Sequence, residues 1–144
     1  MLIITDGVSL YPVTWSSNRL RRVCNSSQQA EIMAANEGTK DLFYVVAMME
    51  ELTGRKIPTK LFTDNKNMFI SITSTTAPTD KRTRVELASL REACMNGELG
   101  GIKHISSKQM LADCLTKRGA PSDRLLAIIQ TGRDNFGEKK ERDD

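Results

Sequence analysis

Three acidic residues occupy positions from which carboxylates commonly do chemistry. Glu31 lies in the first turns of a predicted long helix, Asp64 follows a predicted strand, and Asp113 lies in a helix after the last predicted strand. The carboxyl ends of the strands form the ligand-binding edge of an open α/β sheet. Three carboxylates at that edge would make an all-oxygen site suited to Mg²⁺ or Mn²⁺. We therefore expect these side chains to converge within a few ångströms at one edge of the sheet.

Each carboxylate also has a purely structural explanation. Glu31 could complement the positive end of its helix dipole. Asp64 could cap the helix that begins near Lys66, and Asp113 could simply face solvent. The pattern of residue types alone leaves both interpretations open.

The first half of the chain is predicted to form two strands and a long helix. Residues 2–4 and 11–16 have strand character, with a turn signal at Asp6-Gly7 between them. A helix over residues 28–52 is predicted to be capped by Ser26 and ended by Gly54. The apolar residues expected near one broad face of this helix are Ala30, Met33, Ala34, Leu42, Val45, Val46, Met49 and Leu52.

The second half alternates between strands and helices. The predicted elements are strand 60–63, helices 66–72 and 79–95, strand 101–105, a helix capped by Ser106-Ser107 that carries Met110, Leu111 and Leu115, and a helix around residues 125–129 closed by Gly132. A hairpin followed by βα units predicts an α/β sheet of mixed direction covered by helices. We expect one domain over residues 1–132 and a charged, disordered tail over residues 133–144.

Composition excludes several classes of protein. The chain has 144 residues, 39% of them hydrophobic, with a net charge of +3, which excludes a collagen, a coiled coil and a disordered chain. Its longest apolar run, residues 43–49, is far shorter than the roughly 20 residues of a membrane-spanning helix. No signal-peptide pattern is present, and three scattered cysteines favour neither a disulfide framework nor a zinc site. We expect a soluble, intracellular, reduced protein.

Basic residues form short clusters that could contact phosphate groups. The clusters are Arg19, Arg21 and Arg22, and Lys81, Arg82 and Arg84. Such contacts neutralise the nucleic-acid backbone without reading its sequence. For each cluster taken alone, ordinary solvated surface is the favoured interpretation.

Three other residues invite a functional interpretation. His104 lies within a predicted strand and is expected to be a sheet residue rather than a catalytic base. Tyr11 and Trp15 could stack on nucleic acid, but we expect them to pack in the core.

Several segments together resemble a known family. Residues 11–31, Tyr-Pro-Val-Thr-Trp-Ser-Ser to Gln-Ala-Glu, resemble the ribonuclease H domain of copia-type LTR retrotransposon Pol polyproteins, in which a P-I-S-W-x-S strand leads through a basic loop to a helix bearing Ala-Glu. Residues 62–65, Phe-Thr-Asp-Asn, resemble the family's strand end, and residues 81–92 resemble the helix before its last strand. The best match is Leu-Ala-Asp-Cys-Leu-Thr-Lys-Arg-Gly-Ala over residues 111–120. The segments follow the family order from about residue 2 to residue 132.

The resemblance implies a fold and an activity. The fold would be a ribonuclease H-like mixed sheet flanked by helices. The activity would be two-metal hydrolysis, with Mg²⁺ or Mn²⁺, of the RNA strand in RNA–DNA hybrids. Glu31, Asp64 and Asp113 match the second, third and fourth of the family's four metal-binding carboxylates. The implied partners are an RNA–DNA hybrid and the reverse transcriptase segment of the same polyprotein, with no membrane and no small-molecule cofactor. The implied location is the cytoplasm, a virus-like particle or the nucleus.

One part of the family pattern has no counterpart here. The first carboxylate lies in an S-D-A-like segment of the central strand, whereas this sequence begins with what resembles the following strand. Asp6, the only earlier acid, lies in a turn signal and is not expected to substitute. We therefore expect open edges on the two strands that would flank the central strand, and an inactive or impaired chain. The alternative is a catalytically dead module that binds nucleic acid or supports the polyprotein structurally.

Overall fold

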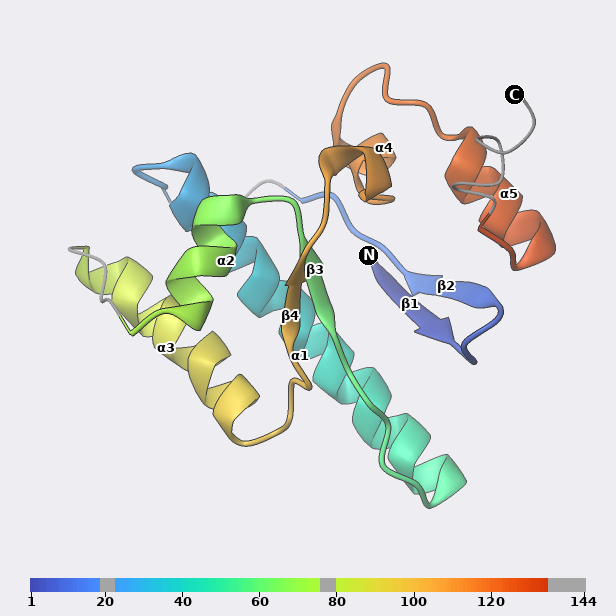
Figure 1. Ribbon diagram of the computed structural model, residues 1–144, viewed down its shortest axis with the longest axis horizontal. Coiled ribbons are helices and arrows are strands. Elements are labelled where there is room, and N and C mark those ends of the chain that lie inside the picture. The colour runs from blue at the N-terminus through green and yellow to red at the C-terminus, as the bar shows by residue number, and fades with distance from the viewer. Residues whose placement is uncertain (19–22, 76–79, 135–144) are drawn as a thin grey trace, which may run out of the picture. The chain divides into compact units, whose positions relative to one another are not determined.

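The computed structural model describes residues 1–18, 23–75 and 80–134 (Figure 1). The chain divides into two compact units, unit 1 (Met1–Arg19 and Ser106–Asp144) and unit 2 (Leu20–Ile105). Each unit contains both helices and strands, which confirms the predicted mixed α/β class. The single domain expected over residues 1–132 stays a prediction, and most of the expected tail, residues 135–144, lies outside the described residues.

Unit 2 is built from three helices and a parallel pair of strands. Its elements are α1 (Ser27–Thr53), β3 (Leu61–Thr63), α2 (Lys66–Thr73), α3 (Lys81–Met95) and β4 (Ile102–His104). The strands β3 and β4 pair in parallel, with Phe62 opposite Lys103. Parallel strands need a crossover connection, and α2 and α3 supply it (Figure 1).

The core of unit 2 lies between the helices and one face of this sheet. Its buried residues are Ile32 from α1, Met68 and Ile72 from α2, and Leu87 and Leu90 from α3. Leu61 and Ile102, which pair across the sheet, pack against this cluster. Because side chains alternate along a strand, Phe62 and Lys103 lie on the opposite face, where both are exposed.

The buried face of α1 differs from the predicted apolar face. The buried residues of this helix are Gln29, Ile32, Asn36 and Thr39. Asn36 Nδ2 donates to the backbone oxygen and to Oε2 of Glu86 on α3, each at 2.7 Å. Buried polar side chains are tolerated when they are hydrogen-bonded, and a partner 50 residues away is not visible in a hydrophobic pattern. Of the eight residues predicted on the apolar face, none is fully buried and six are partly buried.

The second half of α1 exposes three large side chains, of which Leu52 was predicted on the apolar face. Tyr44, Met48 and Leu52 follow one another at four-residue spacing and are 75%, 45% and 75% exposed. At this spacing they form one stripe along the helix surface. Among the helices described, none is both long enough and apolar enough to cross a lipid bilayer.

Unit 1 begins with an antiparallel hairpin of β1 (Leu2–Thr5) and β2 (Leu10–Thr14). Asp6 Oδ1 closes the turn by accepting from the backbone N–H groups of Val8 at 2.9 Å and Ser9 at 2.7 Å. The hydrogen bond from Ser9, and then that from Val8, lowers the pKa of Asp6 below its ordinary value. Gly7 adopts φ 93°, a conformation that favours glycine. The predicted turn at Asp6-Gly7 is confirmed.

The remaining elements of unit 1 are the 3₁₀ helix η1 (Ser107–Gln109), α4 (Asp113–Thr116) and α5 (Asp123–Thr131). The helix α5 packs against β2, where the N–H of Leu10 donates to the carbonyl of Gly132 at 2.7 Å. Gly132 ends α5 in the left-handed conformation, as predicted.

The continuous helix predicted through Met110, Leu111 and Leu115 is wrong. Only η1 and the one-turn α4 form, and Met110 and Leu111 lie between them. The carbonyls of Lys108 and Gln109, which a continuing helix would use as acceptors, accept instead from Nη1 of Arg124, at 3.3 and 3.0 Å. A side chain from α5 therefore supplies hydrogen bonds to the carbonyls at the end of η1.

The described strands form two separate two-stranded sheets rather than the one mixed sheet predicted. One is the antiparallel pair of β1 and β2, and the other is the parallel pair of β3 and β4. No described strand pairs with the outer edge of β1 or of β3. Tyr11 and Trp15, expected in the core, are each about half exposed.

Candidate functional site

Glu31 is exposed and lies beyond the first turn of α1, which begins at Ser27 and contains no acidic residue in that turn. Complementing the helix dipole is therefore a weak explanation for it, because that effect falls off within the first turn. One turn earlier, Gln28 Nε2 donates to Ser71 Oγ at 2.6 Å and to the carbonyl of Asn67 at 3.3 Å. These hydrogen bonds hold the start of α1 against α2.

Asp64 directly follows β3 and is partly buried. The helix that comes next is capped by Asn65, whose Oδ1 accepts from the backbone N–H of Met68 at 3.0 Å. The capping explanation for Asp64 is therefore wrong. His104 ends β4, as predicted for a sheet residue, and its Nε2 lies 3.2 Å from the backbone oxygen of Asp64.

Glu31 and Asp64 belong to the same end of unit 2. Asp64 directly precedes α2, and Gln28 ties the start of α1 to that helix. Figure 1 shows β3 running into α2 at this end of the unit, beside the start of α1. Two of the three predicted carboxylates are therefore carried by elements that contact each other.

Asp113 belongs to unit 1 and is the first residue of α4. Its Oδ2 lies 2.5 Å from Nζ of Lys117, one helical turn further on, and its side chain is 23% exposed. Asp113 is therefore paired and only partly accessible, rather than simply facing solvent. Within residues 1–18, 23–75 and 80–134, no three acidic, histidine or cysteine side chains are placed to hold a metal ion together. Because Asp113 and the other two carboxylates lie in different units, their convergence stays a prediction.

The basic cluster at the start of α3 lies near the same end of unit 2. Lys81, Arg82 and Arg84 are exposed. The cap of this helix, Asp80, accepts from Gln29 Nε2 of α1 at 3.3 Å, which links the two helix starts. The other predicted cluster, Arg19, Arg21 and Arg22, lies outside the described residues.

Asp80 is expected to make the stability of this end of unit 2 depend on pH. Hydrogen bonds from the Thr83 hydroxyl and then from the Thr83 N–H, each 2.7 Å long, lower the pKa of Asp80 below its ordinary 3.8. A lowered pKa in the folded state stabilises the fold above the unfolded-state pKa, and that contribution is lost as the pH falls through the folded-state pKa.

We expect the free energy of unfolding of the wild type to fall relative to that of Asp80→Asn as the pH is lowered from about 5 to about 2. Asn keeps an oxygen acceptor at the cap but does not titrate. Urea denaturation at a series of pH values measures the difference. A difference that stays constant over this range would contradict a role for the ionised cap.

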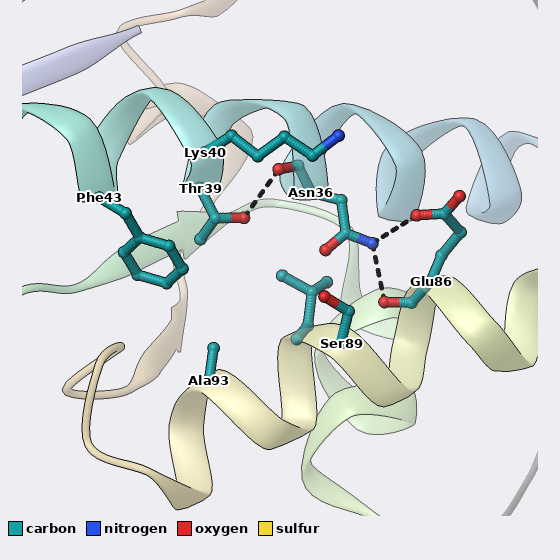
Figure 2. Close-up of a pocket in the computed structure, with 8 residues that line it drawn as sticks. Asn36, Thr39, Lys40, Phe43, Glu86, Ser89 and Ala93 are labelled. Atoms are coloured by element: carbon teal, nitrogen blue, oxygen red, sulfur yellow. Dashed lines mark hydrogen bonds between the residues drawn. The ribbon is translucent and has the colours of Figure 1, made fainter.

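A depression between α1 and α3 was not foreseen from the sequence. Its volume is about 90 Å³, and it is lined by Asn36, Thr39, Lys40, Phe43, Glu86, Ser89, Leu90 and Ala93. Figure 2 shows the two hydrogen bonds from Asn36 to Glu86 at one side and the ring of Phe43 at the other. None of the predicted site residues lines it, so it offers no support for the carboxylate site.

Arg124 was also not singled out in the sequence. Its Nε and Nη2 bind the two carboxylate oxygens of Asp134 at 2.8 and 2.5 Å, in addition to the carbonyl contacts described above. The spacing of charged residues in the sequence does not predict the pair of Arg124 and Asp134, because the packing of α5 brings the two side chains together.

No family model matches this sequence, and neither a curated protein nor a solved structure shows significant similarity to the chain.

Proposed function

We propose that the chain is a ribonuclease H-like domain of a retrotransposon polyprotein that requires one further strand to complete its sheet. The observation that carries this proposal is the pairing of the four strands. An antiparallel hairpin and a parallel pair, each with both outer edges unpaired among the described strands, are what a mixed sheet would leave if its middle strand were absent. The sequence motifs indicate which family this is. The missing strand would pair with the open edges of β1 and β3.

The donor types suit the metal ions that the family uses. Glu31, Asp64 and Asp113 would hold them, and oxygen donors of this kind favour Mg²⁺ and Mn²⁺. A pair of such ions activates the attacking water and stabilises the leaving oxygen during hydrolysis of a phosphodiester. Lys117, which pairs with Asp113 at 2.5 Å, would release that carboxylate when it binds a cation.

The basic start of α3 would hold the substrate. Lys81, Arg82 and Arg84 are exposed, and they lie at the end of unit 2 that carries Glu31 and Asp64. Cations beside a carboxylate site can bind the phosphates that flank the scissile bond. The proposed substrate is therefore an RNA–DNA hybrid, and the proposed partner is the reverse transcriptase segment of the same polyprotein, in an intracellular location.

Affinity for a labelled RNA–DNA hybrid is expected to fall steeply with salt, because each neutralised phosphate contributes about −0.9 to the logarithmic slope on a duplex. Replacing Lys81, Arg82 and Arg84 with Ala should reduce the slope by roughly two to three units. Fluorescence anisotropy at several salt concentrations measures both quantities.

The control variant removes three positive charges at the other end of α1. Arg55, Lys56 and Lys60 are also exposed, and the triple Ala variant has the same net charge as the first. Equal slopes for the two variants would show that net charge, and not a binding surface, governs the affinity. A further outcome would favour the catalytically dead binding module. In that outcome the first variant loses hybrid binding, while neither Mg²⁺ nor Asp64→Asn changes the affinity of the chain for the hybrid.

A further inference from the structure

We propose that Arg124 is a positioning residue that fixes the turn carrying Asp113. This inference rests on the proposed function, because Asp113 matters only if its carboxylate serves the metal site. The side chain of Arg124 comes from α5, eleven residues after Asp113 in the sequence. No spacing rule links the two, and the link is made by hydrogen bonds within unit 1.

The guanidinium group of Arg124 joins three parts of unit 1. Nη1 donates to the carbonyls of Lys108 and Gln109, while Nε and Nη2 bind the carboxylate of Asp134. Both charged side chains are about one quarter exposed, 25% for Arg124 and 23% for Asp134. A paired and largely shielded guanidinium is held in one orientation by its planar fork. Arg124 therefore ties the end of η1 to the residue that follows α5.

The carbonyls that Arg124 binds lie just before the turn that presents Asp113. The chain leaves the helical path directly after these carbonyls, and Met110 adopts an extended conformation with ψ 100°. The N–H of Asp113 then donates to the carbonyl of Met110 at 3.3 Å and starts the separate turn α4. If the helix instead continued, Asp113 would donate to Gln109, and its Cβ would leave the backbone in a different direction.

Lysine at position 124 cannot make the same set of contacts. Its single ammonium group lacks the fork that binds a carboxylate through two nitrogens while a third nitrogen reaches two carbonyls. Arg124→Lys thus keeps the positive charge and removes the forked arrangement of hydrogen-bond donors. The matched control is Arg133→Lys, because Arg133 is exposed and lies in the same unit.

The first test measures Mn²⁺ binding to the full chain by the electron paramagnetic resonance signal of the free ion. We expect Arg124→Lys to weaken binding on the order of 10-fold, as is typical when a residue that orients a metal ligand is changed. Arg133→Lys should bind like the wild type. Combining Arg124→Lys with Asp113→Asn should weaken binding no more than Asp113→Asn alone, because both changes act through one carboxylate.

The outcomes separate the two proposals. If Asp113→Asn weakens Mn²⁺ binding and Arg124→Lys does not, the positioning role is overturned and the metal site stands. If Asp113→Asn leaves binding unchanged, Asp113 is not a ligand, and both proposals fail for this residue.

A second measurement does not depend on metal affinity. Hydrogen exchange followed by mass spectrometry should show faster exchange over residues 107–117 in Arg124→Lys, with no change in α1. Unchanged exchange over residues 107–117 would overturn the role of Arg124 whatever the chain binds. Faster exchange throughout the chain would also overturn it, because it would indicate general destabilisation.

Discussion

The 144-residue chain is expected to leave the RNA strand of an RNA–DNA hybrid uncut in Mg²⁺, whereas a version extended by one strand that carries an aspartate is expected to cut it. Three carboxylates hold two divalent cations poorly, and losing preorganised charge at a catalytic site commonly costs on the order of 10²-fold or more in rate. The loss here is expected to be larger. A strand that paired with both β1 and β3 would also position the elements that carry the other ligands.

A gel assay on a hybrid with labelled RNA measures this difference. Asp64→Asn in the extended version gives the background rate, because it removes a predicted ligand while leaving Asn65 as the cap of α2. A second extended version carries Asn in place of the added Asp. It shows whether the added strand alone restores cleavage or whether the added carboxylate is also needed. If the unextended chain cuts well above the Asp64→Asn background, the interpretation of the N-terminal segment is wrong. Asp6 would then be the next residue to replace, despite its role in the hairpin turn.

The parts of the fold that could be predicted are those decided by neighbours in the sequence. Ser26 caps α1 by accepting from the N–H of Gln29 at 3.1 Å, and Gly54 and Gly132 end their helices with φ of 64° and 70°. Caps and turns act over three or four residues, so their residue types alone identify them. The positions of most helices and strands follow from these local signals.

The predictions that were wrong involve partners far away in the sequence. Asn36 is buried with its hydrogen bonds accepted by Glu86, and the helix after Ser106 ends where Arg124 binds its carbonyls. In each case a polar contact made by the tertiary structure overrides the local pattern. Apolar periodicity carries no information about such contacts.

For the candidate site as well, the local placement of residues could be predicted and their tertiary arrangement could not. The sequence placed Asp64 at the end of a strand and Asp113 in a helix after the last strand, and the structure bears out both placements. Whether the carboxylates converge depends on the arrangement of the two units and on the strand that would join the sheets. Neither is determined by local pattern, which is why the metal site stays a prediction.

The three-helix core of unit 2 leads to the second large expected effect. Leu90 on α3 is 1% exposed and belongs to the cluster formed with Ile32, Met68, Ile72 and Leu87. Leu90→Ala removes buried methyl groups and leaves a cavity, which typically costs about 2–5 kcal/mol in the free energy of unfolding. With a urea m-value of about 1–3 kcal/mol per molar, this loss should lower the denaturation midpoint by at least about 0.7 M.

Val85→Ala is the matched control for this prediction, because Val85 lies on the same helix but is 71% exposed. Its effect should stay within about 0.5 kcal/mol, as for most surface substitutions. Far-ultraviolet circular dichroism in urea reports the transition, since α1, α2 and α3 supply most of the helix in the described residues. Equal midpoints for the two variants would contradict the assignment of Leu90 to the core. A large loss in Val85→Ala alone would show instead that the outer face of α3 is covered, and that the helices pack with the opposite face inward.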